Sequence, residues 1–289
     1  MKISRYTVFF YAILVALLIS STGFSKNQKA AEKISIKELV ERHLRSIGTP
    51  EKLSALKSIT AYGGVESESK GATNGTTSGT SVLASEGNKY LIGLQFPNPD
   101  YPSERIGFDG TNVTVSFLRP GVRSLLGNFI RDNAKTFKQG LLTGALSTAW
   151  EFYRFDEKHS KMKSAGTKNI DGNVCYRVTL NNSSDSDLMV SLYFDAKTFR
   201  HLKTEYTKTL NPSMGASVDL SAYQSETRYR FVEIFDDFRD VGGLTLPNSY
   251  RIYYEDSNGR RTNTMLWNIK LSEVLYNQEI EDSIFHFDG

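Results

Sequence analysis

The chain has 289 residues, of which 39% are apolar and 23% charged, a balance that argues against a disordered chain. The formal net charge is +3, and removal of Lys2 and Arg5 with a leader leaves 33 basic residues against 32 acidic ones. No basic excess remains to neutralise phosphates, so the composition argues against a nucleic-acid partner.

The cysteine and aromatic contents narrow the class of protein further. Cys175 is the single cysteine, which excludes an internal disulfide and a zinc site built from cysteines. It sits in the alternating stretch 174–178, where a packed small side chain is the expected role rather than a nucleophile. Aromatic residues make up 12% of the chain, with 15 Tyr and 17 Phe, and β-strands favour such residues.

The first 25 residues have the order of a secretory signal peptide. Lys2 and Arg5 precede an apolar run from Val8 to Ile19, and small and polar residues follow to Ser25. The run is shorter than the roughly 20 residues that a membrane-spanning helix needs. We therefore predict export with loss of residues 1–25. The alternative is an N-terminal segment that stays uncleaved and anchors the protein to the membrane.

Two helices are predicted within residues 26–57. Ser35 and Glu38 form a capping box, and the apolar stripe that follows has helical spacing. His43 lies on that stripe, where a buried and hydrogen-bonded role is expected. Gly48 ends the first helix, and Pro50 opens a short second one.

From Ser58 onward the apolar period changes to two, which is typical of strands. Each predicted strand has an apolar face of alternating residues. These faces are Tyr90, Ile92 and Leu94; Val113, Val115 and Phe117; Val174, Tyr176 and Val178; Leu188, Val190 and Leu192; Tyr250, Ile252 and Tyr254; and Met265, Trp267 and Ile269. Asp-Gly and Asn-Gly turns at 109–110, 171–172 and 258–259 separate them. The pattern predicts a single antiparallel β domain over 58–289, with about ten or eleven strongly curled strands.

A helical insert is predicted at 122–153, in the middle of the strands. Its apolar residues include Leu126, Phe129, Ile130, Phe137 and Leu141, and Gly140 and Gly144 are expected to break it. Such an insert must pack on a face or an open side of the sheet. It acts either as a movable lid over an apolar cavity or as a static helix that seals a filled core.

The sequence lacks the motifs of a catalytic or metal site. The four histidines, His43, His159, His201 and His286, form no metal-binding pair, and no nucleophile elbow or phosphate-binding loop is present. Asp236, Asp237 and Asp240 form an acidic cluster before Gly242, which is either a calcium-type site or, as we favour, a solvated strand end. We predict no enzyme, no metal and no cofactor.

Several strand and turn motifs resemble the LolA/LolB-like group of bacterial proteins, the outer-membrane lipoprotein-sorting type. The motifs are 38–40, 47–53, 56–59, Phe108-Asp109-Gly110, 170–180, Leu192-Tyr193-Phe194-Asp195 and 238–247. They span most of the chain after the leader. The chain looks longer than the basic carriers of this group.

The resemblance implies a mainly β fold: a strongly curved, unclosed antiparallel half-barrel with helices covering its concave side. It further implies a periplasmic carrier that binds lipid or lipoprotein acyl chains, with lipid or acylated lipoprotein and envelope donor or acceptor proteins as partners. The residues expected at the cavity and its lid are Tyr90, Ile92, Leu94, Val113, Val115, Phe117, Leu126, Phe129, Ile130, Phe137, Leu141, Tyr229, Phe231 and Trp267.

Two other functions remain open from the sequence. The same fold with a filled core would suit a structural or interaction protein of the cell envelope. An envelope hydrolase would need a Ser or Asp paired with a His in a cleft, and the sequence shows no such pairing. A continuous internal cavity favours the carrier, whereas a filled interior favours the structural protein.

Overall fold

The computed structural model describes residues 33–72, 74–158, 160–180, 187–211 and 225–287, and the predicted leader lies outside them. Its helices are α2 (Ile36–Ile47), α3 (Pro50–Ser54), α4 (Leu125–Asp132) and α5 (Ala134–Phe137), with 3₁₀ turns η1 (Gly144–Leu146), η2 (Glu151–Arg154) and η3 (Asp282–Phe285). Its strands are β1 (Ser58–Lys70), β2 (Gly75–Glu86), β3 (Lys89–Gln95), β4 (Ser103–Phe108), β5 (Val113–Val115), β6 (Met162–Ile170), β7 (Asn173–Leu180), β8 (Met189–Asp195), β9 (His201–Leu210), β10 (Thr227–Val241), β11 (Leu244–Ser257) and β12 (Thr262–Tyr276). None of the helices in these ranges is long and apolar enough to cross a membrane.

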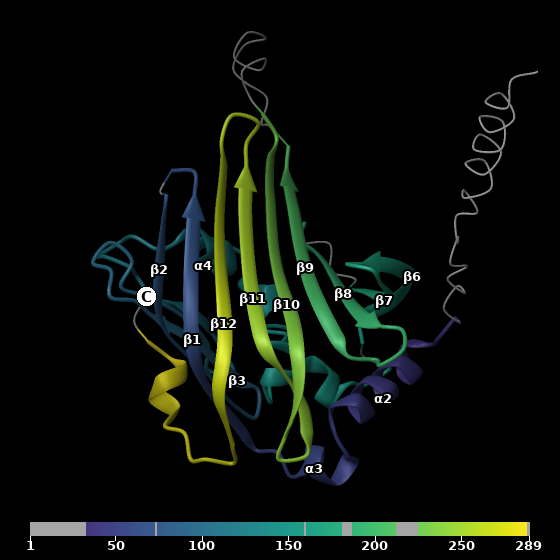
Figure 1. The fold of residues 1–289 in the computed structure, drawn as a ribbon. Helices are drawn as coiled ribbons and strands as arrows, with labels where there is room; N and C mark the ends of the chain where they lie inside the picture. Colours follow the sequence, from purple (N-terminus) through teal and green to yellow (C-terminus); the bar gives the residue numbers. More distant parts are fainter. Residues whose placement is uncertain (1–32, 73, 159, 181–186, 212–224, 288–289) are drawn as a thin grey trace, which may run out of the picture. The chain divides into compact units, whose positions relative to one another are not determined.

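The strands form one antiparallel sheet in the order β5-β4-β3-β2-β1-β12-β11-β10-β9-β8-β7-β6. Figure 1 shows the long strands β1, β12, β11, β10 and β9 side by side. The sheet is unclosed, because β5 and β6 are edges without a partner strand in the described part of the chain. The described residues form twelve strands rather than the ten or eleven expected. The polar β6 carries little of the apolar alternation from which strands are counted.

Contacts across the sheet show that it is strongly curved. Tyr90 on β3 and Tyr206 on β9 both touch Phe137, the first through a 3.1 Å hydrogen bond to its carbonyl oxygen and the second through rings 5.2 Å apart. Six strand spacings separate β3 from β9 in the sheet. In a flat sheet those strands would lie about 29 Å apart. Only a curled sheet brings both side chains to one residue, so the fold is the unclosed half-barrel that the sequence predicts.

Helix α2 begins and ends where its sequence signals lie. The Ser35 hydroxyl accepts a hydrogen bond from the Glu38 amide at 3.1 Å, and the Gly48 amide donates to the Leu44 carbonyl. The helix buries Leu39, Val40, His43 and Ile47. Thr49 caps the short α3 in the same way. The inner stripe of α2 thereby becomes part of the protein core.

The insert between β5 and β6 has two distinct parts. The first is α4 with α5, which are separated at Asn133. The second, residues 140–152, is here named the plug, and its residues 140–150 are all buried. Gly140 adopts a φ of +69°, and a Cβ there would lie 1.9 Å from the Ala149 carbonyl oxygen, so glycine is required at this close approach. The chain therefore leaves helical geometry before the plug.

The C-terminal segment covers the opposite, outer face of β2–β4. Phe285 packs with Ala84 and Leu91 in a second apolar cluster, to which Ile280, Ile284 and Phe287 contribute. A Cβ on Gly107 would collide with the Phe285 carbonyl oxygen at 2.6 Å, so the segment lies directly against β4. This part of the sheet is thus covered on both faces.

Candidate binding site

Most of the residues predicted to bind a ligand lie in a filled core between the insert and the sheet. Eleven of them are at most 5% exposed: Tyr90, Ile92, Leu94, Val115, Leu126, Phe129, Ile130, Phe137, Leu141, Phe231 and Trp267. Val113 and Tyr229 are half-buried, and Phe117 is 37% exposed. The Phe129 ring centroid lies 5.9 Å from that of Tyr229 and 6.3 Å from that of Phe231. Their role in ligand binding stays a prediction.

Open space lies at one end of the half-barrel, on both sides of α4. A cavity of about 550 Å³ lies between the β1–β2 hairpin, the 98–101 loop and residues 118–125. A pocket of about 280 Å³ lies between α4 and the ends of β9, β10 and β11. Leu125 borders both spaces, and Phe129 and Tyr229 border the second. Helix α4 therefore lies between the two spaces.

The larger cavity has both apolar and polar walls. Its apolar side chains are Leu118, Leu125, Met265 and the Tyr101 ring, whereas hydroxyl and amide groups come mainly from the β1–β2 hairpin. Arg119 and Arg123 supply positive charge at the wall. Its volume lies in the roughly 300–1,000 Å³ range of small-molecule sites. Such a lining suits a molecule with both apolar and polar parts.

A buried carboxyl group ties α4 to the wall of this cavity. Glu104 on β4 is 1% exposed and accepts hydrogen bonds from the hydroxyls of Tyr101 and Ser124, each at 2.9 Å. Ser124 is the N-cap of α4 and accepts from the Gly127 amide at 2.7 Å. Burial raises the pKa of Glu104 to about 7, and the two hydroxyl donors act in the opposite direction. The position of the α4 N-terminus thus depends on this carboxyl group.

A second buried carboxyl group holds the plug. Glu233 on β10 is fully buried and accepts from the Thr143 amide at 2.8 Å and from the hydroxyls of Tyr250 and Tyr206 at 2.7 and 2.9 Å. Burial raises its pKa to about 7 despite these donors. The three bonds join the plug to three adjacent strands, because the two tyrosines belong to β11 and β9.

Histidines connect the plug to α2 and β9. The Trp150 indole donates to His43 Nε2 at 3.0 Å, and His43 Nδ1 lies 2.9 Å from the Phe199 carbonyl oxygen. Trp150 also stacks on His201, with ring centroids 4.9 Å apart. Burial lowers the pKa of His43 to about 4, which keeps the ring neutral at neutral pH. His43 is therefore a buried and hydrogen-bonded side chain.

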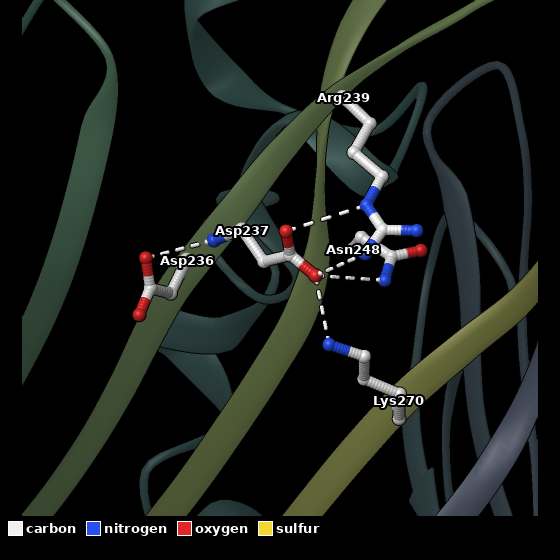
Figure 2. Close-up of polar contacts among 5 residues, drawn as sticks. All are labelled: Asp236, Asp237, Arg239, Asn248 and Lys270. Carbon is white, nitrogen blue, oxygen red and sulfur yellow. Dashed lines mark hydrogen bonds and ion pairs between the residues drawn. The ribbon is translucent and has the colours of Figure 1, made fainter.

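The acidic cluster near Gly242 is a surface ion-pair network. Figure 2 shows the Asp237 carboxylate directed at Lys270, Arg239 and Asn248. The Lys270 ammonium lies 2.7 Å from it, and this hydrogen bond is the main cause of the lowered pKa of Asp237. No group of three metal-ligating side chains occurs among the described residues. The Asp237 carboxylate is thus paired with the cationic side chains of Lys270 and Arg239.

Of the side chains that could serve a hydrolase, His201, His286 and Cys175 are buried or have other partners, and His159 lies outside the described residues. His201 and Thr204 lie 2.9 Å apart, but both are at most 3% exposed. His286 contacts the Asp109 carboxylate at 2.9 Å rather than a nucleophile. Cys175 is buried, and burial raises the pKa of its thiol to about 11, which opposes thiolate formation.

Neither Glu104 nor Glu233 was predicted from the sequence as a site residue. Glu233 has a visible signal, because it stands between Phe231 and Phe235 on the same face of an otherwise apolar strand. No sequence signal marks Glu104, because its partners Tyr101 and Ser124 become neighbours only when the 98–101 loop and α4 pack against β4. The sequence likewise gives no sign that Arg119 and Arg123 border the cavity, because the cavity forms only when distant segments pack together.

The arrangement defines a class of fold: an open antiparallel half-barrel with a helical insert on its inner face and a cavity at one end. No protein-family model matches the chain, and no curated protein does. Solved structures do match it over most of its length. A LolA superfamily protein from Nitrosomonas europaea is 17% identical, with 88% of this chain and 99% of that chain covered, at a TM-score of 0.44.

Two further solved structures are similar. An outer membrane lipoprotein-sorting protein domain from Vibrio parahaemolyticus is 10% identical, covering 85% of this chain and 97% of its own, with a TM-score of 0.40. Lipoprotein LppX from Mycobacterium tuberculosis is 12% identical, covering 86% and 99%, with a TM-score of 0.23. The first two structures carry the names of the group that the sequence motifs resemble.

Proposed function

We propose that the chain is a non-enzymatic, exported binding protein that takes an acyl chain of a lipid or lipoprotein into the cavity beside α4. The observation that carries the proposal is the cavity of about 550 Å³ at the open end of the half-barrel. Its apolar side chains would contact the acyl chain, and its hydroxyl, amide and arginine groups would contact the polar end. Each methylene group buried contributes about 0.8 kcal/mol, so even part of an acyl chain gives useful affinity.

Helix α4 is the element that would adjust to a longer ligand. It separates the larger cavity from the pocket of about 280 Å³, and Leu125 borders both. A small shift of α4 would join the two spaces without moving the plug. In this proposal the buried Phe129 and the half-buried Tyr229 contact the ligand only at the far end of the enlarged site.

The periplasm is the proposed location, with the predicted leader as the export signal and envelope proteins as donors or acceptors of the ligand. The competing function is a structural or interaction protein of the envelope. The filled core around Phe137 and Trp150, both 0% exposed, supports that alternative. The two functions differ in whether the end cavity binds anything.

A fluorescent fatty-acid probe tests the proposal directly. We expect saturable binding by the purified protein without its leader, and at least tenfold weaker binding by Met265→Trp, because the larger side chain fills the cavity that Met265 borders. Tyr62→Trp is the matched control, since Tyr62 lies on β1, is 44% exposed and does not border that cavity. Circular dichroism and thermal melting would verify that both variants fold.

Two outcomes would contradict the binding function. Absence of saturable probe binding by the wild type would leave the envelope structural protein as the better function. Equal binding by Met265→Trp and the wild type would place the site elsewhere. Mass spectrometry of lipids extracted from protein purified from a bacterial envelope would then identify any natural ligand.

A further inference from the structure

A short hairpin at the cavity mouth leaves apolar side chains in solvent. Residues 118–122 turn back on themselves through two 2.8 Å backbone hydrogen bonds, from Leu118 to the Val122 carbonyl and from Val122 to the Arg119 carbonyl. Val122 is 45% exposed, Leu125 is 40% exposed and Phe117 is 37% exposed. Large apolar side chains clustered this way on a soluble protein mark a surface for interaction.

The same hairpin carries positive charge and no negative charge. Arg119 is exposed, and the Arg123 guanidinium lies 3.8 Å over the Phe117 ring while its Nε donates to the Val115 carbonyl at 3.0 Å. The sequence has no Asp or Glu from 110 to 131. The acids that flank this stretch are already engaged, Asp109 with His286 and Asp132 with Arg131.

We propose that residues 117–125 are a docking surface for an anionic lipid bilayer. Aromatic and aliphatic side chains interleaved with arginine match the boundary between headgroups and acyl chains. Arg119 and Arg123 match the negative surface of such a bilayer, although Asp100 borders the same cavity and Asp132 lies near enough to Arg123 to act on it. Leu118, Arg119, Arg123 and Leu125 also border the cavity of about 550 Å³. Docking here therefore opens the cavity mouth onto the lipid, and the hairpin, not the cavity, provides the membrane affinity.

The hairpin geometry suits a rigid contact. Gly121 takes a φ of +77°, which allows the tight turn after Pro120, and a Cβ there would meet nothing within 4 Å, so the turn projects into open space. The exposed side chains are thus presented without a cost for ordering a loop on binding. Val122 does not border the cavity, so it can be changed without altering the proposed ligand site.

Co-sedimentation with vesicles tests the docking surface. The wild type should bind vesicles of phosphatidylglycerol and phosphatidylcholine more tightly than vesicles of phosphatidylcholine alone, with a preference that declines as salt rises. Val122→Asp should weaken binding roughly tenfold or more. Arg119→Gln combined with Arg123→Gln should weaken binding to the anionic vesicles about 30-fold and abolish the preference for them.

Two control variants test whether weaker vesicle binding is specific to residues 117–125. Tyr62→Asp places an acid at another exposed apolar residue, and Lys37→Gln with Arg45→Gln removes two charges from the exposed side of α2. Both should bind vesicles like the wild type. Absence of vesicle binding by the wild type, equal binding by Val122→Asp, or equal losses in the control variants would overturn the proposal. Capture of a protein that depends on Val122 without any vesicle binding would assign the hairpin to a protein partner and also overturn it.

The docking surface and the proposed ligand site are tested by different experiments, so one can be contradicted while the other is supported. The fatty-acid probe measures the cavity in solution without vesicles, and Val122→Asp should bind that probe like the wild type. Loss of vesicle binding with retained probe binding supports docking. Vesicle binding by a wild type that binds no probe would preserve the docking surface and remove the proposed carrier function.

Discussion

The two parts of the insert, α4 and the plug, differ in how the fold holds them. Residues 140–150 of the plug are all buried, and hydrogen bonds join it to Glu233, His43 and Ser85 on three separate elements. Helix α4 buries one face, including Leu126 and Ile130, but lies between two spaces of about 550 and 280 Å³. One continuous insert thus contributes both a buried plug and a helix that borders open space on two sides. The lid predicted for the whole insert is therefore better assigned to α4 alone.

Truncation of a plug side chain is expected to have the largest effect on the free energy of unfolding. Trp150→Ala should lower the free energy of unfolding by about 3–5 kcal/mol, because it removes a fully buried ring that stacks on His201. Leu125→Ala on α4, at a 40% exposed position, should change it by less than about 0.5 kcal/mol. Urea denaturation followed by fluorescence and circular dichroism measures both. A cost below about 1 kcal/mol for Trp150→Ala would show that the plug is not a core element.

The buried carboxyl of Glu233 predicts a pH dependence of stability. Its pKa is raised from 4.5 to about 7 in the folded protein, so its stabilising contribution is complete below pH 4.5 and is lost as pH rises through 7. Glu233→Gln removes this loss. Relative to the variant, the wild type should therefore lose up to about 3 kcal/mol between pH 4.5 and 8. Urea denaturation across that range measures the difference. Parallel profiles of the two proteins would refute the shift, and Glu66→Gln, at an exposed position, should reproduce the wild-type profile.

Phe129 offers a test of the boundary between core and cavity. It is 4% exposed but borders the pocket of about 280 Å³. Phe129→Ala should cost about 2 kcal/mol, below the usual 3–5 for Phe→Ala, because the lost volume extends an existing space instead of creating an enclosed void. The same variant should bind the fatty-acid probe more weakly. Leu141→Ala in the plug, by contrast, should cost about 2–5 kcal/mol and leave probe binding unchanged. Equal costs for the two variants would indicate that α4 is as tightly packed as the plug.

The smallest expected effect concerns the N-cap of α4. Ser124→Ala removes the acceptor of the Gly127 amide and one donor to Glu104, and should cost about 1 kcal/mol. Hydrogen exchange should then accelerate in α4 while the amides of residues 140–150 stay protected. Ser35→Ala, at the N-cap of α2, should leave exchange in α4 unchanged. Equal acceleration in the plug would mean that the two parts open together.

Local patterns predicted the fold class well, because strand alternation and turn residues act over a few positions. The capping box at Ser35 and the alternating strand of Tyr250 and Ile252 appear in the structure as expected. The edge strand β6 was missed, since its polar sequence shows little apolar alternation, whereas the alternation of Val113 and Val115 predicted β5. The candidate binding site was harder to predict from the sequence than the fold. Whether Phe137 faces a void or another ring depends on how tightly the sheet curls, and no local pattern encodes that curvature.

Strand order carries a consequence for how the molecule folds. The strand β12 lies between β1 and β11, and its register joins Ile59 to Tyr276 across most of the described chain. Every other pairing in the sheet, from β1–β2 to β10–β11, connects strands that follow one another in sequence. During synthesis two separate meanders can therefore form early, but they cannot join until β12 has emerged. Because closing such a long loop is entropically costly, formation of the single continuous sheet is expected to be the late, rate-limiting event, and loss of β12 alone would divide the sheet in two.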